Sequence, residues 1–367
     1  MDNLNFLDIF NKLQDEIKNQ EPVNIMVVGK TGVGKSTLIN NVFREPIAKV
    51  GIGKPVTKCL KKIVKEGIPV NIYDTKGLEL DTHIQKEIRQ EILEFMSKEK
   101  RVDVCWYCMS GSQSRLEEEE VELIETLAEY APVIIVITMA YMKYQVEEFK
   151  RLIDSKNLNC VNIIPVLAES YGDEDEGKIF QSFGLDILVK VTAEVIPQEY
   201  QTAFINAQKP SIDLKVKEAR KVVYKYCGGS GVIGASPIPF SDAPLLVADQ
   251  VAMIAKITNV FGLSLDKALM MTIISSAAGT TGTTFAGKTL VTNMLKMIPG
   301  VGTVAGGVIG GGVAASLTFS LGLAYIKVCE FIVKEETKGN RVEGDQIIEK
   351  MQDAFKKELK IKFNTGG

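Results

Sequence analysis

The spacing of apolar residues predicts alternating strands and helices through the N-terminal part of the chain. Short apolar runs of strand length lie at residues 23–28, 69–73, 102–109, 133–138 and 161–166. Residues 38–43 and 114–130 have apolar positions at helical spacing, and a long helix is predicted from residue 178 onward. This alternation favours an α/β fold, in which helices cover both faces of a mostly parallel sheet.

The C-terminal part has a different pattern. Residues 228–326 hold only seven charged residues but 16 of the 31 glycines in the chain. Its uncharged segments, 268–287 and 297–326, are each long enough to span a bilayer as a helix. Small residues recur every four positions, which lets helix backbones pack closely: Gly302, Gly306, Gly310 and Ala314; Gly307, Gly311 and Ala315; Gly279, Thr283 and Gly287. The rows predict an antiparallel hairpin that turns near Pro299, in either a soluble bundle or a membrane.

Composition narrows the functional classes. The chain has 43 Lys and Arg against 46 Asp and Glu, a net charge of −3, which argues against a protein whose whole surface binds nucleic acid. Six cysteines and one histidine are too few and too scattered for a disulfide framework or a typical zinc site. Residues 1–20 have the pattern of an amphipathic helix and not of a secretory signal. A cytoplasmic protein is expected, with peripheral or integral membrane association left open.

A glycine-rich motif follows the first apolar run. Residues 29–37 fit the pattern G-x-x-x-x-G-K-[ST] between a predicted strand and a predicted helix. In such a loop, backbone N–H groups and the helix N-terminus bind phosphates. Lys35 is expected to bind the β- and γ-phosphates, and Ser36 a Mg²⁺ ion. The remaining nucleotide-binding residues predicted here are Gly29, Thr31, Gly32, Val33, Gly34 and Thr37.

A second motif narrows the class of nucleotide-binding domain. The run 69–73 leads into Asp74-Thr75-Lys76-Gly77, and the preceding loop, residues 50–57, ends in Thr57. Together with the phosphate loop, these motifs resemble the translation-factor-related class of P-loop GTPases, which includes Era- and TrmE-like proteins. The resemblance implies a Ras-like fold, GTP or GDP with Mg²⁺ as ligands, and an antiparallel edge strand at residues 57–64.

Three residues of these motifs are predicted to act with Lys35 in catalysis or metal binding. Asp74 is expected to bind Mg²⁺ through water, and the N–H of Gly77 to sense the γ-phosphate. Thr57 is predicted to close on the Mg²⁺ ion, or else simply to begin a strand. In this interpretation, Thr57 belongs to switch I and the segment from Asp74 to Gly77 to switch II.

The base-binding motif departs from the family pattern. Where the family reads guanine with [NT]-K-x-D, this chain has Thr138-Met139-Ala140-Tyr141, without the Lys and the Asp. Residues 166–170 resemble the S-A loop of the family. Thr138, Ala168 and Glu169 are therefore expected at the base. Glu147 or Glu148 either reaches the base or stays solvated on its helix, and acceptance of adenine stays open.

Two features concern hydrolysis and assembly. Leu78 stands where Ras-like proteins have a water-positioning Gln, so slow intrinsic hydrolysis is expected. The phosphate loop resembles that of septins and immunity-related GTPases, which pair nucleotide face to nucleotide face. A homodimer is therefore a hypothesis, in which Arg115 either reaches across to the partner or stays solvated.

Ser114 and Glu117 are expected to form a capping box at a solvated helix start.

The charge-poor region contains Pro-Ile-Pro-Phe-Ser-Asp at residues 237–242 and Asp-Gln-Val-Ala-Met at residues 249–253. With these segments it resembles a helical domain of unknown function, numbered 697, that is often fused to Era-like GTPases in bacteria. The sequence thus predicts a GTPase domain over residues 1–205 and a glycine-rich, all-helical domain over residues 206–367. Basic residues at 214–225 make a membrane surface a candidate partner, beside an unknown protein effector.

The sequence leaves two candidate functions. The first is a Mg²⁺-dependent GTP-binding and GTP-hydrolysing switch whose state is coupled to the helical domain. The alternative is a non-catalytic nucleotide-binding scaffold or membrane-remodelling module with relaxed base specificity.

Overall fold

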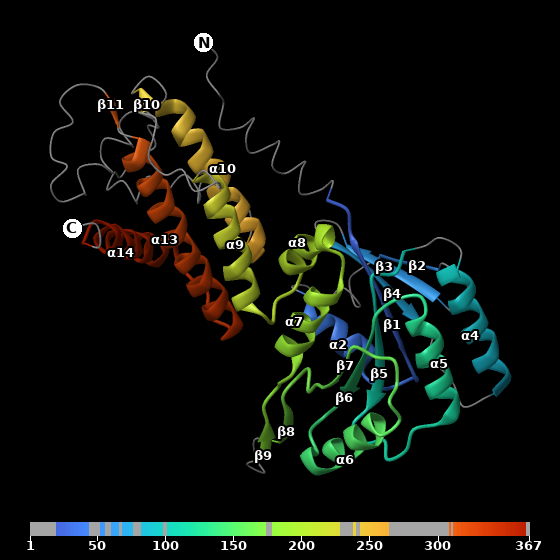
Figure 1. Cartoon of the computed structure of the whole chain (residues 1–367). Coiled ribbons are helices and arrows are strands. Elements are labelled where there is room, and N and C mark those ends of the chain that lie inside the picture. Colours follow the sequence, from blue (N-terminus) through green and yellow to red (C-terminus); the bar gives the residue numbers. More distant parts are fainter. Residues whose placement is uncertain are drawn as a thin grey trace. The chain divides into compact units, whose positions relative to one another are not determined.

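Figure 1 shows the computed structural model of the chain. The structure describes residues 20–43, 52–55, 60–65, 68–75, 82–97, 101–173, 178–227, 238–239, 243–263, 308–309 and 311–364. Two compact units divide between Ser211 and Ile212. The domain boundaries given by the sequence stay predictions, and residues 1–19 of the expected N-terminal helix lie outside the described residues.

The first unit, Gln20–Ser211, is built on a seven-stranded sheet in the order β2-β3-β4-β1-β5-β6-β7. Its strands are β1 (Val23–Gly29), β2 (Ile52–Pro55), β3 (Leu60–Lys65), β4 (Ile68–Thr75), β5 (Val104–Ser110), β6 (Val133–Thr138) and β7 (Asn162–Pro165). The strands from β4 to β7 in this order pair in parallel, whereas β3 is antiparallel to β4 and β2 is antiparallel to β3. The predicted α/β fold with a mostly parallel sheet is confirmed.

Helices cover both faces of this sheet because the buried strands present apolar side chains in both directions. They are α2 (Lys35–Val42), α4 (Thr82–Ser97), α5 (Glu118–Ala128), α6 (Lys143–Asp154), α7 (Leu185–Val195) and α8 (Gln198–Ala207). Helices α4, α5 and α6 share one apolar core with the side of β5 that carries Tyr107. On the opposite side, the Trp106 indole N–H donates to Thr192 of α7 at 3.1 Å, and the Trp106 ring stacks on Phe43 at 6.3 Å.

The long helix predicted from residue 178 onward is wrong. Instead, β8 (Tyr171–Asp173) pairs antiparallel with β9 (Lys178–Phe180), and α7 begins only at Leu185. Gly184 has a φ of 85°, and a Cβ atom there would collide with the carbonyl oxygen of Pro165. Helix α7 then ends before Pro197, which is the N-cap of α8. Turn residues at both ends therefore interrupt a segment whose apolar spacing alone resembles one helix.

The second unit is helical over most of its described residues. Its elements are α9 (Ile212–Tyr226), α10 (Ala243–Phe261), α13 (Gly311–Thr337), α14 (Gly344–Asn364) and the short antiparallel pair of β10 (Ile238–Pro239) and β11 (Val308–Ile309). The four helices share one apolar core. At Gly322 of α13, a Cβ atom would lie 2.6 Å from a Val223 methyl carbon of α9, so the absence of a side chain allows these two helices to pack closely.

Helix α13 overlaps the uncharged segment 297–326, which is long enough to span a bilayer. Among the described residues, Ser316–Thr337 is the one helical stretch long and apolar enough to cross a membrane, and 67% of its apolar window is buried inside the protein. Neighbouring α10 pairs with its polar groups: Gln250 donates to Thr318 at 3.2 Å, and the Thr258 and Tyr325 hydroxyls lie 2.7 Å apart. In this structure α13 is a core helix. The predicted turn near Pro299 and the glycine rows before residue 311 lie outside the described residues.

Candidate nucleotide-binding site

The loop between β1 and α2 joins the centre of the sheet to a helix N-terminus. Its glycines adopt backbone conformations that residues with side chains rarely adopt: φ is 79° at Gly32 and 89° at Gly34. Gly29 also has a positive φ, and a Cβ atom there would collide with the carbonyl oxygen of Cys108 on β5. The glycines therefore allow a tight turn at the carboxyl end of β1, where the first N–H groups of α2 can bind an anion.

Lys35 begins α2, and its side chain lies inside this loop. The residue is only 9% exposed, and its Nζ donates to the carbonyl oxygens of Gly29 at 2.8 Å and Lys30 at 3.0 Å. Burial lowers the pKa of Lys35, while the negative charge of Asp74 acts in the opposite direction. Among the other predicted loop residues, Val33 is buried and Thr31, Ser36 and Thr37 have exposed side chains.

Asp74 lies near the end of β4, the strand next to β1. Its Oδ1 is buried and has no hydrogen-bond partner among the residues that the structure describes. Burial raises the pKa of Asp74, although the charges of Lys35 and Lys61 lower it. A buried carboxylate oxygen without a donor suits a hard divalent cation, and the exposed Ser36 hydroxyl is also an oxygen ligand, so the chemistry of both residues suits the predicted Mg²⁺ ion.

The two remaining predicted catalytic residues belong to the expected switch loops. Thr57 of switch I and Gly77 of switch II lie outside the described residues. The loop expected over residues 50–57 does contain a described element, the edge strand β2. It pairs antiparallel with β3, so the single antiparallel edge strand expected at residues 57–64 is here a pair of strands.

The segment after β6 packs against the phosphate loop. The Thr138 hydroxyl oxygen lies 2.5 Å from the carbonyl oxygen of Val33 and 2.9 Å from that of Met109, and its one proton serves one carbonyl at a time. Met139 has a positive φ of 51°, and its Cε lies 3.4 Å from where a Cβ atom of Gly34 would be. Thr138 and Met139 thus support the shape of the phosphate loop.

The segment after β7 lies next to the one after β6. The Ala140 N–H donates to the carbonyl oxygen of Val166 at 3.2 Å. Ala168 is half-buried, and Glu169 is exposed with its Oε1 accepting from Asn41 of α2 at 2.9 Å. The structure therefore gathers Thr138, Ala168 and Glu169 at the carboxyl ends of β6 and β7, the sheet edge where α/β folds bind ligands.

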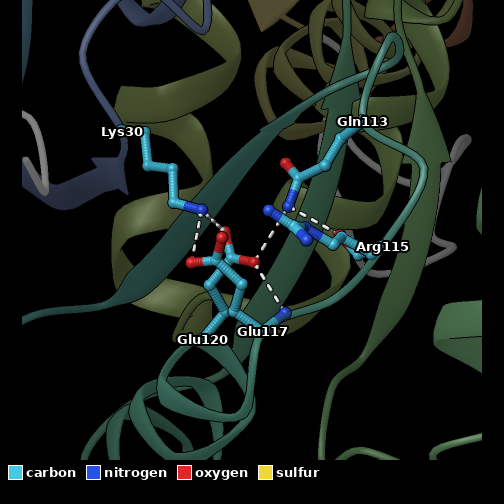
Figure 2. A network of polar contacts seen from close by, with 5 residues as sticks. All are labelled: Lys30, Gln113, Arg115, Glu117 and Glu120. Atoms are coloured by element: carbon cyan, nitrogen blue, oxygen red, sulfur yellow. Dashed lines mark hydrogen bonds and ion pairs between the residues drawn. The ribbon is translucent and has the colours of Figure 1, made fainter. Parts of the chain in front are cut away.

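A charged network that the sequence alone did not predict connects the phosphate loop to the start of α5 (Figure 2). The Lys30 Nζ lies 2.8 Å from a Glu117 carboxylate oxygen and 3.3 Å from one of Glu120. Glu120 is only 5% exposed, and its other oxygen accepts from the Gln113 amide at 2.9 Å and from the Glu117 N–H at 3.1 Å. The carbonyl oxygen of the exposed Arg115, two residues after Gln113, accepts from the same Gln113 amide at 2.9 Å.

The capping box predicted at this helix start is wrong in its residues. Helix α5 begins at Glu118, and the box is formed by Glu117 and Glu120 instead of Ser114 and Glu117. A carboxylate accepts the backbone N–H of the first turn as a hydroxyl does, so Glu117 can replace a serine. The first turn is also not fully solvated, because Glu120 is buried against Lys30. The three-residue spacing of Glu117 and Glu120 is the sequence signal for this capping box. Their partner Lys30 is far away in the sequence, so the spacing does not reveal the ion pairs.

The β8–β9 hairpin brings aromatic side chains to Tyr141. The rings of Tyr141 and Tyr171 stack with centroids 4.7 Å apart and planes at 25°, and Phe180 lies 6.4 Å from Tyr141 at a tilt of 52°. The backbones of Leu167 and Phe183 pair by two hydrogen bonds of 3.0 and 3.1 Å at the base of the hairpin. Sequence reasoning missed this cluster because residue 178 was assigned to a helix.

A glycine phosphate loop on the central strand of a mostly parallel sheet, with an aspartate at the end of the next strand, defines a P-loop nucleotide-binding domain. Residues 24–139 match the family described as 50S ribosome-binding GTPase. Residues 205–357 match a domain of unknown function, DUF697. One region of the chain thus matches a GTPase family and a later region matches the DUF697 family, in the order that the sequence motifs predicted.

Known proteins resemble this chain over part of its length. It is 26% identical over 235 residues to cell division control protein 10 of Encephalitozoon cuniculi, covering 56% of this chain and 65% of that protein. It is 31% identical over 147 residues to the tRNA modification GTPase MnmE of Clostridioides difficile, covering 39% of this chain and 31% of that protein. Magnetosome membrane protein 22 of Magnetospirillum gryphiswaldense is 26% identical over 148 residues, 40% of this chain and 70% of that protein.

The chain spans 65% of the first of these relatives and 31% of the second. Solved structures that are similar to part of the chain include a probable GTP-binding protein engB, with 21% identity, a TM-score of 0.35, and coverage of 47% of this chain and 98% of that one. Another is Toc33 from Arabidopsis thaliana in complex with Mg²⁺ and GMPPNP, with 18% identity, a TM-score of 0.32, and coverage of 55% and 91%.

Proposed function

We propose that this chain is a Mg²⁺-dependent molecular switch that binds and hydrolyses GTP and whose nucleotide state is coupled to the helical unit. The observation that carries the proposal is Asp74. Its buried Oδ1 lacks a donor among the described residues, and its carboxylate interacts electrostatically with Lys35 of the phosphate loop. An unpaired carboxylate beside a lysine and a helix N-terminus suits a ligand made of a metal ion and phosphates.

Each predicted site residue would bind the part of the ligand that suits its charge or its hydrogen-bonding group. Backbone N–H groups from Gly29 to Lys35 would bind the phosphates, with the Lys35 ammonium on the β- and γ-phosphates. Ser36, Asp74 and Thr57 would hold the Mg²⁺ ion, which when bound neutralises charge that develops on the phosphates. The Gly77 N–H would sense the γ-phosphate. With Leu78 at the water-positioning place, turnover is expected to be slow.

Phosphate release from GTP tests this proposal. The full chain should release phosphate in the presence of Mg²⁺, and Lys35→Ala should abolish the release. Lys156→Ala is the matched control, because it removes an exposed lysine of the same unit, and it should keep wild-type turnover. A wild-type chain that binds GTP but releases phosphate no faster than Lys35→Ala would overturn the enzyme proposal.

A non-catalytic scaffold with relaxed base specificity is the second candidate. Met139 and Tyr141 favour it, since neither residue supplies the carboxylate that accepts from the guanine base. Calorimetric titration with GDP and ADP separates the two candidates. Equal affinities without Mg²⁺-dependent turnover would favour the scaffold, whereas turnover lost in Lys35→Ala would favour the switch.

Assembly and membrane contact are proposed separately. If the GTPase unit dimerises when it hydrolyses GTP, the turnover per chain should rise with protein concentration. Membrane contact is supported by the likeness to a protein named as a magnetosome membrane protein, and the apolar stretch Ser316–Thr337 would have to leave the helical core to take part in it. Liposome flotation in the nucleotide-free, GDP and GTP states tests it, and no flotation in any state would remove the proposal.

A further inference from the structure

Exposed apolar side chains gather near the predicted base site. Large hydrophobic residues are normally buried, and a group of exposed ones often marks a binding surface. Most of the exposed large hydrophobic residues among those that the structure describes come from the segments that follow β6 and β7: Met139, Met142, Tyr144, Tyr171, Ile179, Phe180, Phe183 and Ile187. Within this group, the rings around Tyr141 have a defined geometry.

Tyr141 follows the end of β6 and packs against a side chain from each strand of the hairpin. It stacks on Tyr171 of β8 and contacts Phe180 of β9 at a tilt. The Tyr171 and Phe180 side chains are 57% and 41% exposed, so the cluster offers open ring surface. Aromatic rings in contact with one another limit each other's motion, and their outer faces can then receive another planar group at a small entropic cost.

The cluster is continuous with the phosphate loop. Thr138 contacts the Val33 carbonyl oxygen, Met139 contacts Gly34, and Tyr141 follows two residues later. The Ala140 N–H joins this segment to Val166 at the end of β7. A nucleotide with its phosphates in the loop would therefore place its base at the edge where Tyr141 and the β8–β9 hairpin lie.

The nearby carboxylates do not match the missing guanine-binding aspartate. Glu169 accepts from Asn41 at 2.9 Å, and a hydrogen bond to Glu148 raises the pKa of the Tyr144 hydroxyl. Glu147 is exposed on α6, where water solvates its charge. The surface that the contacts define beside the loop is therefore aromatic. Stacking on aromatic rings depends little on the identity of the base, since every base has a π-face.

Resting on the proposed function, we propose that Tyr141 and Tyr171 form a stacking platform for the purine base of the nucleotide and contribute equally to guanine and adenine binding. The platform is one-sided. A base inserted between two rings needs centroids about 7 Å apart, twice a contact distance of about 3.5 Å, whereas these centroids are 4.7 Å apart. The base therefore stacks on an outer face of the pair, with Phe180 supporting the edge of Tyr141.

Competitive binding to the full chain tests the platform. GDP, ADP and inorganic tripolyphosphate are titrated against wild type, Tyr141→Leu, Tyr171→Leu and Tyr141→Phe. Tripolyphosphate has no base, so it reports damage to the phosphate loop alone. Tyr130→Leu is the matched control, because Tyr130 is an exposed tyrosine after α5 and outside the cluster.

Both leucine variants should weaken GDP and ADP by the same factor, about tenfold, and leave tripolyphosphate within about twofold of wild type. Tyr141→Phe and Tyr130→Leu should bind as wild type does. Unchanged nucleotide binding in both leucine variants would overturn the platform, as would an equal loss of tripolyphosphate. A loss confined to GDP would mean that the tyrosines make contacts specific to guanine, which overturns the equal contribution to both bases. A loss in Tyr141→Phe as large as that in Tyr141→Leu would mean that the hydroxyl group, and not stacking of the ring, binds the nucleotide.

Failure of the proposed function has a different signature. If only the platform is wrong, wild type binds nucleotide and Lys35→Ala abolishes the binding, while the tyrosine variants behave as wild type. If the chain does not bind nucleotides at all, wild type binds neither nucleotide nor tripolyphosphate, which overturns both proposals. If only the hydrolysis is wrong, wild type binds nucleotide without releasing phosphate, and the tyrosine variants still decide the platform.

Discussion

Asp74 shows how one side chain links the stability of the apo fold to ligand binding. Its folded-state pKa lies above the ordinary value of 3.8 because burial penalises the carboxylate more than Lys35 and Lys61 stabilise it. The folded state thus holds this proton more tightly than the unfolded state does. The contribution of Asp74 to stability therefore falls as pH rises from 3.8 through the raised pKa, and a bound cation would reverse that penalty.

Asp74→Asn should separate these two effects. The amide keeps the shape of the side chain without the buried charge, so the free energy of unfolding of the apo chain should stay the same or rise. The increase in nucleotide affinity caused by Mg²⁺ should disappear. Thermal unfolding and calorimetric titration of GDP with and without Mg²⁺ measure the two effects, with Asp154→Asn as an exposed control.

The pH dependence of the Mg²⁺ effect on GDP affinity tests the same role of Asp74 in the wild-type chain. As pH falls through the raised pKa of Asp74, protons compete with Mg²⁺, so the Mg²⁺-dependent gain in GDP affinity should decline. A gain that persists unchanged in Asp74→Asn would contradict a role for this carboxylate in metal binding.

Lys30 is the second residue whose substitution should change the free energy of unfolding by a predictable amount. Burial acts to lower its pKa, but the hydrogen bond to Glu117 and the charge of Glu120 outweigh burial, so the pKa is raised above 10.5. The stabilisation is fully present below 10.5 and lost as pH rises through the folded-state pKa. Lys30→Met should lower the free energy of unfolding by about 1–3 kcal/mol, because it leaves the buried Glu120 without its cation.

Chemical denaturation of Lys30→Met, Glu120→Gln and the double variant measures this coupling. The double variant should lose less stability than the sum of the single losses, since the second change removes the charge that the first left unpaired. Lys209→Met replaces an exposed lysine of the same unit and serves as control. Additive losses would mean that the Lys30–Glu120 contact contributes nothing of its own.

Residues predictable from the sequence are those whose function depends on neighbours in the chain. Gly29, Lys35 and Asp74 lie in short motifs, where spacing alone indicates the chemistry. Glu120 and Tyr171 gain their importance from Lys30 and Tyr141, which are far away in sequence and meet them only in the folded sheet. Single-sequence reasoning supplies no such pairing, so the start of the helix that contains Glu120 was expected to be solvated.

At the scale of elements, periodicity predicted the buried strands well because both faces of the sheet are covered. It failed around residues 178–184, where tertiary contacts decide the structure: β9 pairs with β8, and Gly184 passes close to Pro165. It also left open whether residues 297–326 enter a membrane. The described part, α13, shows how an apolar helix can be covered by α9, α10 and α14 instead.

The close packing of α9 and α13 yields an element-scale prediction. Gly322→Ala adds a methyl group that would lie 2.6 Å from one Val223 methyl carbon and 3.1 Å from the Met253 sulfur. Alanine improves helix propensity by about 1 kcal/mol, but overpacking costs about 1–3 kcal/mol. Because Val223 is β-branched and stiff, the net effect should be a loss of about 1 kcal/mol in the stability of the helical unit.

Hydrogen exchange of peptides from α9 and α13 measures this loss in the full chain. Val223→Ala alone should also destabilise the unit, because it opens a cavity. In the double variant the new methyl group would occupy part of that cavity, so the combined loss should be smaller than the sum. A Gly322→Ala chain as stable as wild type would contradict the prediction, because α9 and α13 could then move apart without loss of free energy.

The described residues form two compact units, each with apolar side chains buried inside it, and this arrangement allows nucleotide coupling to be tested directly. Trp106 is the only tryptophan and is buried beside Thr192 in the first unit, so its fluorescence reports unfolding of the GTPase unit alone. Ligand at about a hundredfold excess over its Kd should stabilise that unit by about 2.7 kcal/mol. Hydrogen exchange of α13 reports the helical unit independently.

The proposed switch requires a response from both reporters. GDP with Mg²⁺ should raise the midpoint of the Trp106 transition, and replacing GDP by a non-hydrolysable GTP analogue should change the exchange rate of α13. A ligand shifts a distant equilibrium only by its differential affinity for the two states, and the coupling is reciprocal. Gly322→Ala should therefore alter the ratio of GTP-analogue to GDP affinity, while Lys35→Ala should abolish both responses. If α13 exchanges equally in every nucleotide state while Trp106 responds, the two units act independently, and the DUF697 domain is not the effector of this GTPase.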